Sequence, residues 1–217
     1  MACPAIRPIR SGSMDGRRLG SDPIDTVLPR VWLVRHGETE WAKLGRHTGR
    51  TDIPLTELGR EQAASVGARL AGRPFALVLS SPLSRALDTA RLAGFANRVQ
   101  TSDDLLEWDY GADEGRTTAE IRLERPTWTI WGDGPKGGET IRHVGTRVDR
   151  VIALARQQAG DVLLFAHGHV LRILAARWLG EGPAKGQMFA LSTATLSILG
   201  WEREQPVIER WNDTTEY

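Results

Sequence analysis

Short apolar runs alternate with longer amphipathic stretches from Pro29 onward, and this alternation restricts the fold more than any other feature of the chain. The short runs, typical of strands, are Val31 to Val34, Ala76 to Leu79, Val162 to Ala166 and Ala194 to Leu199. The longer stretches, which suit helices, are Thr56 to Ala71, Pro82 to Ala93, Thr140 to Gln158 and Val170 to Leu179. Strands alternating with helices predict an α/β fold, in which an open, mostly parallel sheet carries helices on both faces.

The chain divides into two parts by composition, and the second part contains an irregular segment. Its 217 residues suffice for one domain with a real core, and we expect residues 29–217 to form it. Residues 1–28 combine Pro, Gly, Ser and four arginines without an apolar period, so they are expected to be a disordered N-terminal extension. Residues 109–139, rich in Gly, Pro, Trp and charge, are too irregular for the sheet and are predicted to form a lid over one edge.

The charge balance provides no general attraction for a polyanion. The chain has 28 Lys and Arg against 27 Asp and Glu, a formal net charge of +1. We therefore expect neither a nucleic acid nor a membrane as partner, but a small molecule. A single cysteine, Cys3, excludes an intrachain disulfide, and no apolar run approaches the ~20 residues of a membrane span. A cytoplasmic location fits, and the oligomeric state is left open, a homo-oligomer included.

Two of the predicted strands end in a histidine followed by a glycine. Arg35, His36 and Gly37 follow the first run, and His167 and Gly168 follow the third. Ligands of open α/β sheets bind at the carboxyl ends of the strands, and a glycine there lets the backbone approach a ligand. A lone histidine at a strand end is more often structural. If the two strands are neighbours, however, both histidines lie in one crevice.

An imidazole beside a guanidinium suits phosphoryl chemistry. A neutral imidazole is a nucleophile towards phosphorus, and a guanidinium fork can hold the phosphoryl oxygens. Arg85 is a further candidate, because Ser81 and Pro82 predict a helix start just before it, and a helix N-terminus favours anions. The alternative is that Arg85 lies on the surface and forms an ion pair with Asp88.

No metal and no cofactor are expected. His167 and His169 are two positions apart, but alternate positions of a strand face opposite sides and no carboxylate cluster completes a site. We therefore expect His169 to support the residues of the site from behind, and not to bind a metal. His47 and His143 are expected to be solvated or structural.

Six motifs occur in order along the chain, and they are Leu33–Thr39, Thr56–Gly59, Ser80–Ala86, Glu107–Gly111, Gly137–Thr140 and Ala166–His169. Together they resemble the histidine phosphatase superfamily, which includes the cofactor-dependent phosphoglycerate mutases and many phosphatases. The resemblance extends from residue 31 to the ending 211–213. It implies that His36 is the nucleophile that becomes phosphohistidine, with Arg35, Arg85 and His167 around the phosphoryl group.

The resemblance also implies a general acid at Glu107, which protonates the leaving oxygen as it departs. A solvated loop glutamate is the alternative, because acidic residues crowd this segment. Thr48, a position that touches substrate in the resembled family, and Gly168 complete the expected substrate contacts. Ala42 departs from the pattern, since many mutases of the family have an amide side chain there.

Hydrolysis is favoured over mutase activity. Family mutases have a long basic insertion after the general acid, whereas the stretch between Glu107 and His167 is short and has no adjacent arginine pair. Four blocks are most similar to the sedoheptulose bisphosphatase type and to broad acid phosphatases, namely Gly45–Gly49, Leu106–Trp108, Arg125–Trp131 and Phe165–Arg172.

The prediction is thus a metal-independent phosphatase of small phosphomonoesters, sugar phosphates and bisphosphates among them, with a place in carbohydrate metabolism. A second phosphate would need a cation outside the catalytic pocket, for which the candidates are Arg46, Arg50, Arg116 and Lys136. The alternatives are a cofactor-dependent phosphoglycerate mutase and a catalytically silent phospholigand-binding protein.

Overall fold

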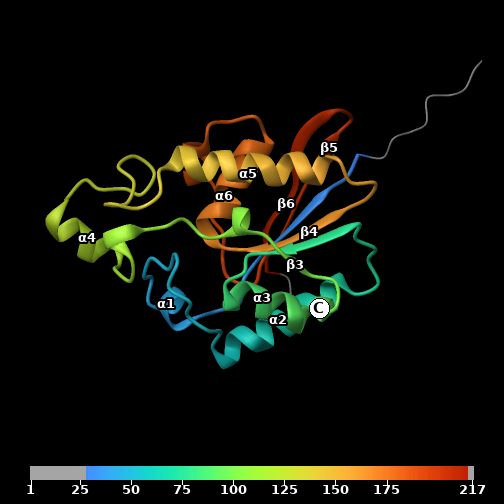
Figure 1. Ribbon diagram of the computed structural model, residues 1–217, viewed down its shortest axis with the longest axis horizontal. Coiled ribbons are helices and arrows are strands. Elements are labelled where there is room, and N and C mark those ends of the chain that lie inside the picture. Colours follow the sequence, from blue (N-terminus) through green and yellow to red (C-terminus); the bar gives the residue numbers. More distant parts are fainter. Residues whose placement is uncertain (1–27, 215–217) are drawn as a thin grey trace, which may run out of the picture.

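The computed structural model describes residues 28–214, so the predicted extension lies outside them except for Leu28. Six strands form one sheet in the order β3-β2-β4-β1-β5-β6 (Figure 1). Neighbours among β3, β2, β4 and β1 pair in parallel, and β5 runs antiparallel between β1 and β6. The predicted open, mostly parallel sheet is confirmed. The strands are β1 Val31–Arg35, β2 Leu77–Ser80, β3 Gln100–Thr101, β4 Val162–Ala166, β5 Leu196–Glu202 and β6 Gln205–Asp213.

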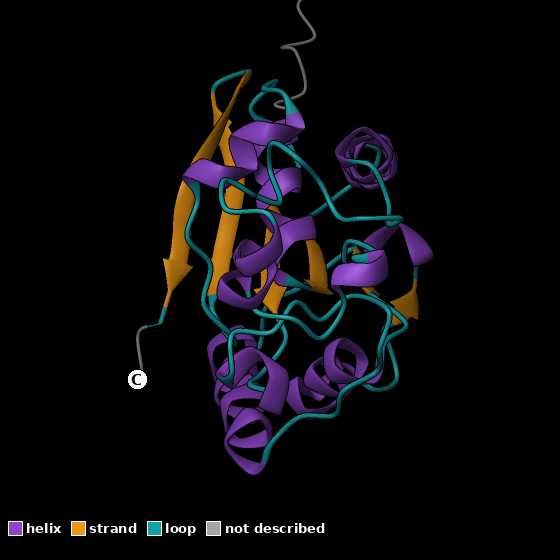
Figure 2. Cartoon of the chain, turned by 90° about the vertical axis from the view of Figure 1, so that its left-hand side faces the viewer, coloured by secondary structure: helices purple, strands orange, loops and turns teal. Residues whose placement is uncertain are grey.

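Helices lie on both faces of this sheet, as predicted (Figures 1 and 2). One face is covered by α5 and α6, and the other by α2, α3 and the π-helical turn that continues α3. The bounds of these elements are α2 Glu57–Leu70, α3 Ser84–Ala90, π-helical turn Arg91–Phe95, α5 Ile141–Arg156 and α6 Gly168–Trp178. Shorter helical elements are α1 Glu40–Lys43, α4 Thr118–Glu124 and the 3-10 turns Asp103–Leu105, Gly111–Asp113 and Pro183–Met188.

The two central strands, β1 and β4, are apolar apart from Arg35 at the end of β1, because both of their faces are buried. Leu33 of β1 and Leu164 of β4 pack in the core beneath α5 and α6. Val34 and Phe165, one position further along each strand, pack in the core on the side of α2 and α3. Successive side chains of a strand point to opposite faces, so an uninterrupted apolar run is what a strand between two helical layers requires.

The first turn of α3 differs from the prediction. The helix begins at Ser84 rather than at Pro82, and Leu83 in the N-cap position makes no side-chain cap. The Asp52 carboxylate accepts the Ser84 N–H at 2.9 Å instead. A residue more than thirty positions earlier in the chain thus supplies the acceptor that Ser81 was expected to provide.

The last strands were only partly predicted. The run from Ala194 was expected to be extended, but Ala194 has a φ of +54° and β5 begins two residues later, at Leu196. β6 was not predicted, because polar residues interrupt its sequence and its side chains are exposed or half-buried. The short edge strand β3 carries no apolar run that could mark it.

Residues 109–139 are held by contacts within the segment and by backbone hydrogen bonds that His47 makes with Gly115 and Arg116. Thr117 and Glu120 form a reciprocal capping box at the start of α4. The Asp113 carboxylate, 1% exposed, accepts the Lys136 N–H at 2.9 Å and pairs with the Arg125 guanidinium. These contacts fix the segment's internal structure, and its role as a lid stays a prediction.

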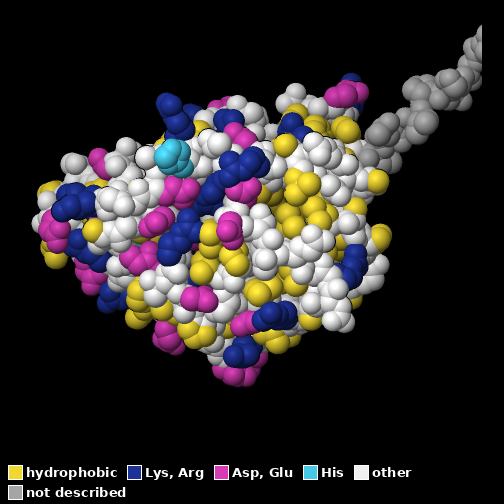
Figure 3. All heavy atoms as spheres, in the orientation of Figure 1, with side chains coloured by type: hydrophobic (Ala, Val, Ile, Leu, Met, Phe, Trp, Pro, Cys, Tyr) yellow, Lys and Arg dark blue, Asp and Glu magenta, His cyan; other side chains and the backbone are white. Residues whose placement is uncertain are grey.

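The surface and the helices agree with the charge and hydropathy of the sequence. On the face shown in Figure 3, basic side chains lie interspersed with acidic ones. None of the helices between residues 28 and 214 has the length and apolar character needed to cross a membrane.

Candidate active site

A pocket of about 190 Å³ opens where β1 and β4 end. Arg35 pairs with Ala166 in the parallel register, and the His36 N–H donates to the Ala166 carbonyl at 3.0 Å. The two strands are therefore neighbours, and the segments that follow them begin side by side. The rings of His36 and His167 lie 5.2 Å apart between centroids, so the crevice expected from the sequence is present.

The hydrogen bonds of His36 define its tautomer. Its Nδ1 lies 2.7 Å from the Gly37 carbonyl oxygen, which can only accept, so Nδ1 carries the proton. Nε2 makes no hydrogen bond within residues 28–214, and the residue lines the pocket. Burial, and then the charges of Arg35 and Arg85, hold the pKa of His36 well below its usual range. The pocket thus receives a neutral imidazole with the Nε2 lone pair free.

Arg35, on the pocket wall, and His167, fully buried behind His36 and not itself a lining residue, each have a donor without a partner. The His167 Nδ1 accepts from the Arg85 Nε at 3.1 Å, which leaves the proton on His167 Nε2, and this atom is buried without a partner. The Arg35 guanidinium donates to the Leu191 carbonyl, but its Nε is also buried without a partner. An unpaired buried donor costs about 1–3 kcal/mol, and an anion that accepts from both would remove this cost.

Arg85 does not line the pocket; it lies on the Nδ1 side of the His167 ring, to which its Nε donates. It lies in the first turn of α3 with 0% exposure, which excludes the expected alternative of a surface pair with Asp88. Its guanidinium donates to the carbonyls of Gly49, at 2.8 Å, and Thr51, at 3.0 Å. Arg85 therefore fixes the 48–51 loop and the tautomer of His167, and adds positive charge to the site.

Glu107 is 4% exposed, so the alternative of a solvated loop glutamate is wrong. Its Oε1 accepts the N–H groups of Trp108 and Val170, and its Oε2 accepts that of His169, each at 2.9 Å. Two of these donors belong to the N-terminal turn of α6, where a carboxylate is favoured. The three bonds hold the carboxyl at the pocket, and Oε2 retains the larger free acceptor capacity.

His169 was expected on a strand, but it lies in the first turn of α6. Its Nδ1 is 2.7 Å from the Tyr110 hydroxyl. Burial raises the pKa of Tyr110 and lowers the pKa of His169, so the tyrosine keeps its proton and donates. Both side chains line the pocket. His169 thus contributes its N–H to Glu107 and its ring to the wall.

Two residues expected to contact substrate, Thr48 and Gly168, and the departing position Ala42 lie around this centre, and their contact with substrate stays a prediction. Thr48, Gly168 and Ala42 all line the pocket, and Thr48 Oγ1 donates to the Arg46 carbonyl at 3.0 Å. Gly37 is required for a different reason from the one expected. A Cβ there would come within 2.2 Å of the Gly59 carbonyl oxygen, so this glycine permits close packing against α2 rather than the approach of a ligand.

Five residues that line the pocket were not predicted as site residues, namely Gly45, His47, Tyr110, Arg172 and Leu191. Arg172 stacks over the Trp131 ring at 4.6 Å and donates to the Gly186 carbonyl at 3.2 Å. Its position three residues after His169 would have placed it one turn along the same helix face, had the predicted helix been started at Gly168 instead of Val170. His143, by contrast, is exposed as expected.

Among residues 28–214, no group of three or more His, Cys, Asp or Glu side chains is arranged to hold a metal ion. The cations of the site are guanidinium groups, which stabilise the charge of a phosphoryl group by hydrogen bonds in a fork geometry.

The family model and the curated relatives that this chain resembles agree with one another. The model of the histidine phosphatase superfamily (branch 1) matches residues 31–214. An acid phosphatase of Mycobacterium tuberculosis is 44% identical over 177 residues, 80% of this chain and 87% of that protein. The sedoheptulose 1,7-bisphosphatase of Saccharomyces cerevisiae is 38% identical, over 74% of this chain and 71% of that protein.

Solved structures agree with these sequence relatives. The product of an open reading frame of Mycobacterium tuberculosis superposes with a TM-score of 0.80 at 40% identity, covering 85% of this chain and 97% of that one. A mycobacterial glucosyl-3-phosphoglycerate phosphatase in complex with VO3 superposes with a TM-score of 0.74 at 29% identity, covering 86% and 100%. This chain therefore belongs to branch 1 of the histidine phosphatase superfamily and is a phosphatase.

Proposed function

We propose that the enzyme hydrolyses small phosphomonoesters in two steps through a phosphohistidine on His36. The observation that supports this most directly is the neutral His36 ring, whose Nε2 lone pair is free while the Arg35 Nε and the His167 Nε2 lack partners. A nucleophile and one donor for the oxygens of a phosphoryl group thus lie on the pocket wall, and a second donor, His167, lies directly behind the nucleophile.

In the first step, the His36 Nε2 attacks the phosphorus atom and the bond from phosphorus to the ester oxygen breaks. Glu107, held at the pocket by three backbone N–H groups, gives its proton to the departing oxygen, so that an alcohol leaves instead of an alkoxide. Arg35 and His167 donate to the phosphoryl oxygens while charge is redistributed among them.

In the second step, water attacks the phosphohistidine. Glu107, now a carboxylate, removes a proton from this water as the new P–O bond forms and the P–N bond breaks. Inorganic phosphate leaves, and His36 returns to its neutral form with Nδ1 still donating to the Gly37 carbonyl. The proton gained by Glu107 restores the acid for the next turnover, so the cycle balances without a metal ion.

For the substrate class we propose sugar phosphates, with bisphosphates included. The sedoheptulose bisphosphatase relative suggests this, and Arg172 and Arg46 add cationic side chains to the pocket wall. Of the other cations expected for a second phosphate, Arg116 is paired with Glu124 at 2.6 Å, and neither Arg50 nor Lys136 lines the pocket. Arg172 therefore replaces them as the leading candidate.

Neither alternative function is favoured by a particular observation. A catalytically silent binding protein would not need the nucleophile, a donor and the candidate acid together, whereas His36, Arg35 and Glu107 all line this pocket. A mutase must exclude water from its phosphohistidine, and the stretch from Glu107 to His167 has no long basic insertion that could do this.

Phosphate release from a panel of phosphorylated sugars and glycerates tests the substrate class. Arg172→Ala should lower kcat/KM about 10- to 100-fold for a preferred bisphosphate, as expected for the loss of one charge-assisted hydrogen bond, and leave p-nitrophenyl phosphate nearly unaffected. Arg177→Ala, on the same helix but paired with Asp149, is the matched control. Equal losses on both substrates would exclude Arg172 as the residue that binds a second phosphate.

A further inference from the structure

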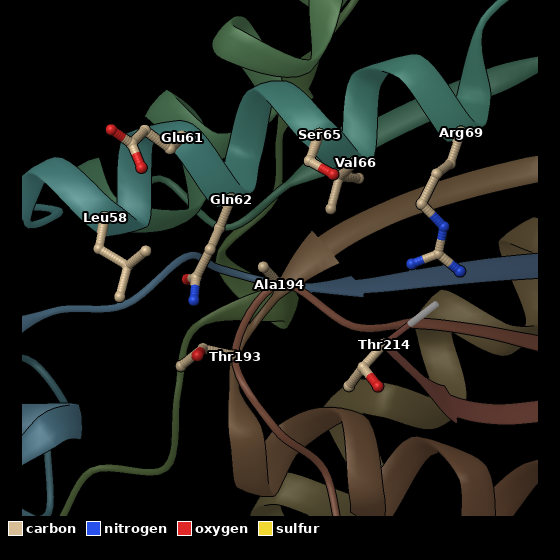
Figure 4. Close-up of a pocket in the computed structure, with 9 residues that line it drawn as sticks. All are labelled: Leu58, Glu61, Gln62, Ser65, Val66, Arg69, Thr193, Ala194 and Thr214. Carbon is tan, nitrogen blue, oxygen red and sulfur yellow. The ribbon is translucent and has the colours of Figure 1, made fainter. Parts of the chain in front are cut away.

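A second pocket lies between α2 and the backbone turn that precedes β5 (Figure 4). Its volume is about 300 Å³, larger than the catalytic pocket. The α2 side chains that line it are spaced three and four residues apart, so they occupy one face of the helix. Gln62, Ser65 and Arg69 of α2 line one side of the pocket, and Thr193 and Ala194 of the turn line the other.

Two residues that line this pocket are hydrogen-bonded to the backbone of residues 35–38, the segment that carries His36. The Gln62 Oε1 accepts the Glu38 N–H at 2.9 Å. On the opposite wall, the Ala194 N–H donates to the carbonyls of Arg35, at 3.1 Å, and His36, at 3.0 Å. Two residues of the pocket wall thus hold the backbone of residues 35–38 from both sides.

The turn at Ala194 is under backbone strain. Its φ of +54° is in the left-handed region, which a residue with a Cβ adopts only at a cost of about 1–3 kcal/mol. The hydrogen bonds to Arg35 and His36 compensate for this conformation. A ligand that displaces the turn therefore alters the bonds that position the catalytic segment.

The wall of the pocket offers several donors to an anion and includes one acidic residue, Glu61, whose carboxylate points away from Gln62 and Thr193 in Figure 4. The Arg69 side chain is 5% exposed, and its Nε is buried without a partner, although its terminal nitrogens bind Asp213. Figure 4 shows the Arg69 guanidinium at one end of the pocket and Gln62 facing Thr193 across it. The Gln62 amide nitrogen and the hydroxyls of Ser65 and Thr193 add further donors.

Apolar side chains complete the wall. Val66 and Leu58 lie on the helix side and Ala194 on the other, so a ligand with a short carbon skeleton fits better than a bare inorganic ion. The volume of about 300 Å³ is at the lower end of the range for small-molecule sites.

We propose that this pocket binds a small organic anion, a carboxylate or a phosphate-type group on a short carbon skeleton, and that its occupation changes kcat by displacing residues 35–38. The binding half of the proposal is independent of the proposed mechanism, and the kinetic half uses the phosphatase activity only as a readout. Failure of the proposed nucleophile would thus leave the binding result intact.

Binding is measured on the whole chain by the NMR signal of the Arg69 Nε–H, assigned with Arg69→Gln. Citrate represents carboxylates, and methylphosphonate represents phosphate-type anions that cannot be hydrolysed. We expect at least one of them to shift this signal saturably. Ser65→Trp places a large ring in the pocket from an exposed helix position and should abolish the shift. Ala64→Trp, on the neighbouring exposed position outside the pocket, is the matched control and should keep it.

The kinetic experiment uses p-nitrophenyl phosphate at saturation, where competition at the catalytic pocket no longer affects the rate. We expect the probe that binds to change kcat about fivefold or more, the lower range of ordinary coupling between sites, in wild type and Ala64→Trp but not in Ser65→Trp. Binding without any change in kcat would overturn the coupling. An Arg69 signal that neither probe shifts, or a shift that survives Ser65→Trp, would overturn the site itself.

Discussion

Glu107→Gln separates the proposed acid role of this side chain from its structural one. Oε1 accepts two backbone N–H groups and Oε2 accepts one. A glutamine has a single acceptor oxygen, and its NH₂ group must face at least one of these three donors. One buried N–H then loses its acceptor, at a cost of about 1–3 kcal/mol, which lowers Tm by roughly 2–12 °C for a chain of this size.

The loss of activity should depend on the leaving group. Removal of the proton donor should cost about 10²- to 10⁴-fold in kcat/KM for a sugar phosphate, whose alkoxide is a poor leaving group. The loss should be small for p-nitrophenyl phosphate, because p-nitrophenolate departs without protonation. The assay is kcat/KM of both substrates for wild type and mutant below the mutant's Tm. Glu181→Gln, at an exposed position just after α6, controls for the loss of a carboxylate elsewhere.

Equal losses on the two leaving groups would refute the acid assignment. Glu107 would then only position α6, through the N–H groups of His169 and Val170, and the proton donor would have to be another residue. His167, with its Nε2–H already in the site, is the next candidate.

Three further predictions follow from the charges and the buried histidines. EDTA should leave turnover unchanged and vanadate should inhibit, because guanidinium groups supply the positive charge; an absolute need for an added divalent ion would contradict this. The acid limb of kcat/KM should lie below pH 6.5, because the pKa of His36 is lowered by burial and by Arg35 and Arg85; an acid limb above neutral pH would show that His36 is not the group that titrates. Folding stability should be complete above about pH 6.5 and fall as the pH decreases below it, since the lowered pKa values of His36, His167 and His169 make only the unfolded chain take up these protons. The slope approaches about 1.4 kcal/mol per pH unit for each histidine, measurable by urea titration at several pH values, and a stability that is flat or rising on acidification to pH 5 would refute it.

The sequence was sufficient to predict an element or a site residue where the side-chain type and the local pattern agree. The runs of β1 and β4 are apolar at every position because both faces are buried, so they were recognised together with the histidines that follow them. Arg85 was placed correctly in the first turn of α3, although the boundary shifted from Pro82 to Ser84 because Asp52 provides the capping acceptor.

The features of the site that were not predicted depend on contacts between distant parts of the chain. The carboxyl of Glu107 is fixed by N–H groups of α6, and nothing in the local sequence of either segment indicates this bond. His169 was assigned to a strand because Val162 to Ala166 reads as one, whereas the chain turns at His167 and begins a helix at Gly168. Arg172 and Tyr110 were therefore missed as parts of the pocket wall.

Rapid acid-free quenching of the enzyme with ³²P-labelled substrate, followed by mass spectrometry of the phosphopeptide, tests the central claim most directly. The Gly37 carbonyl occupies the Nδ1 side of the His36 ring, so the phosphoryl group should be found on His36 and on Nε2 only. The label should form and decay at rates that account for turnover. A phosphoryl group on His167, one on the Nδ1 atom of His36, or turnover without any labelled histidine would contradict the account.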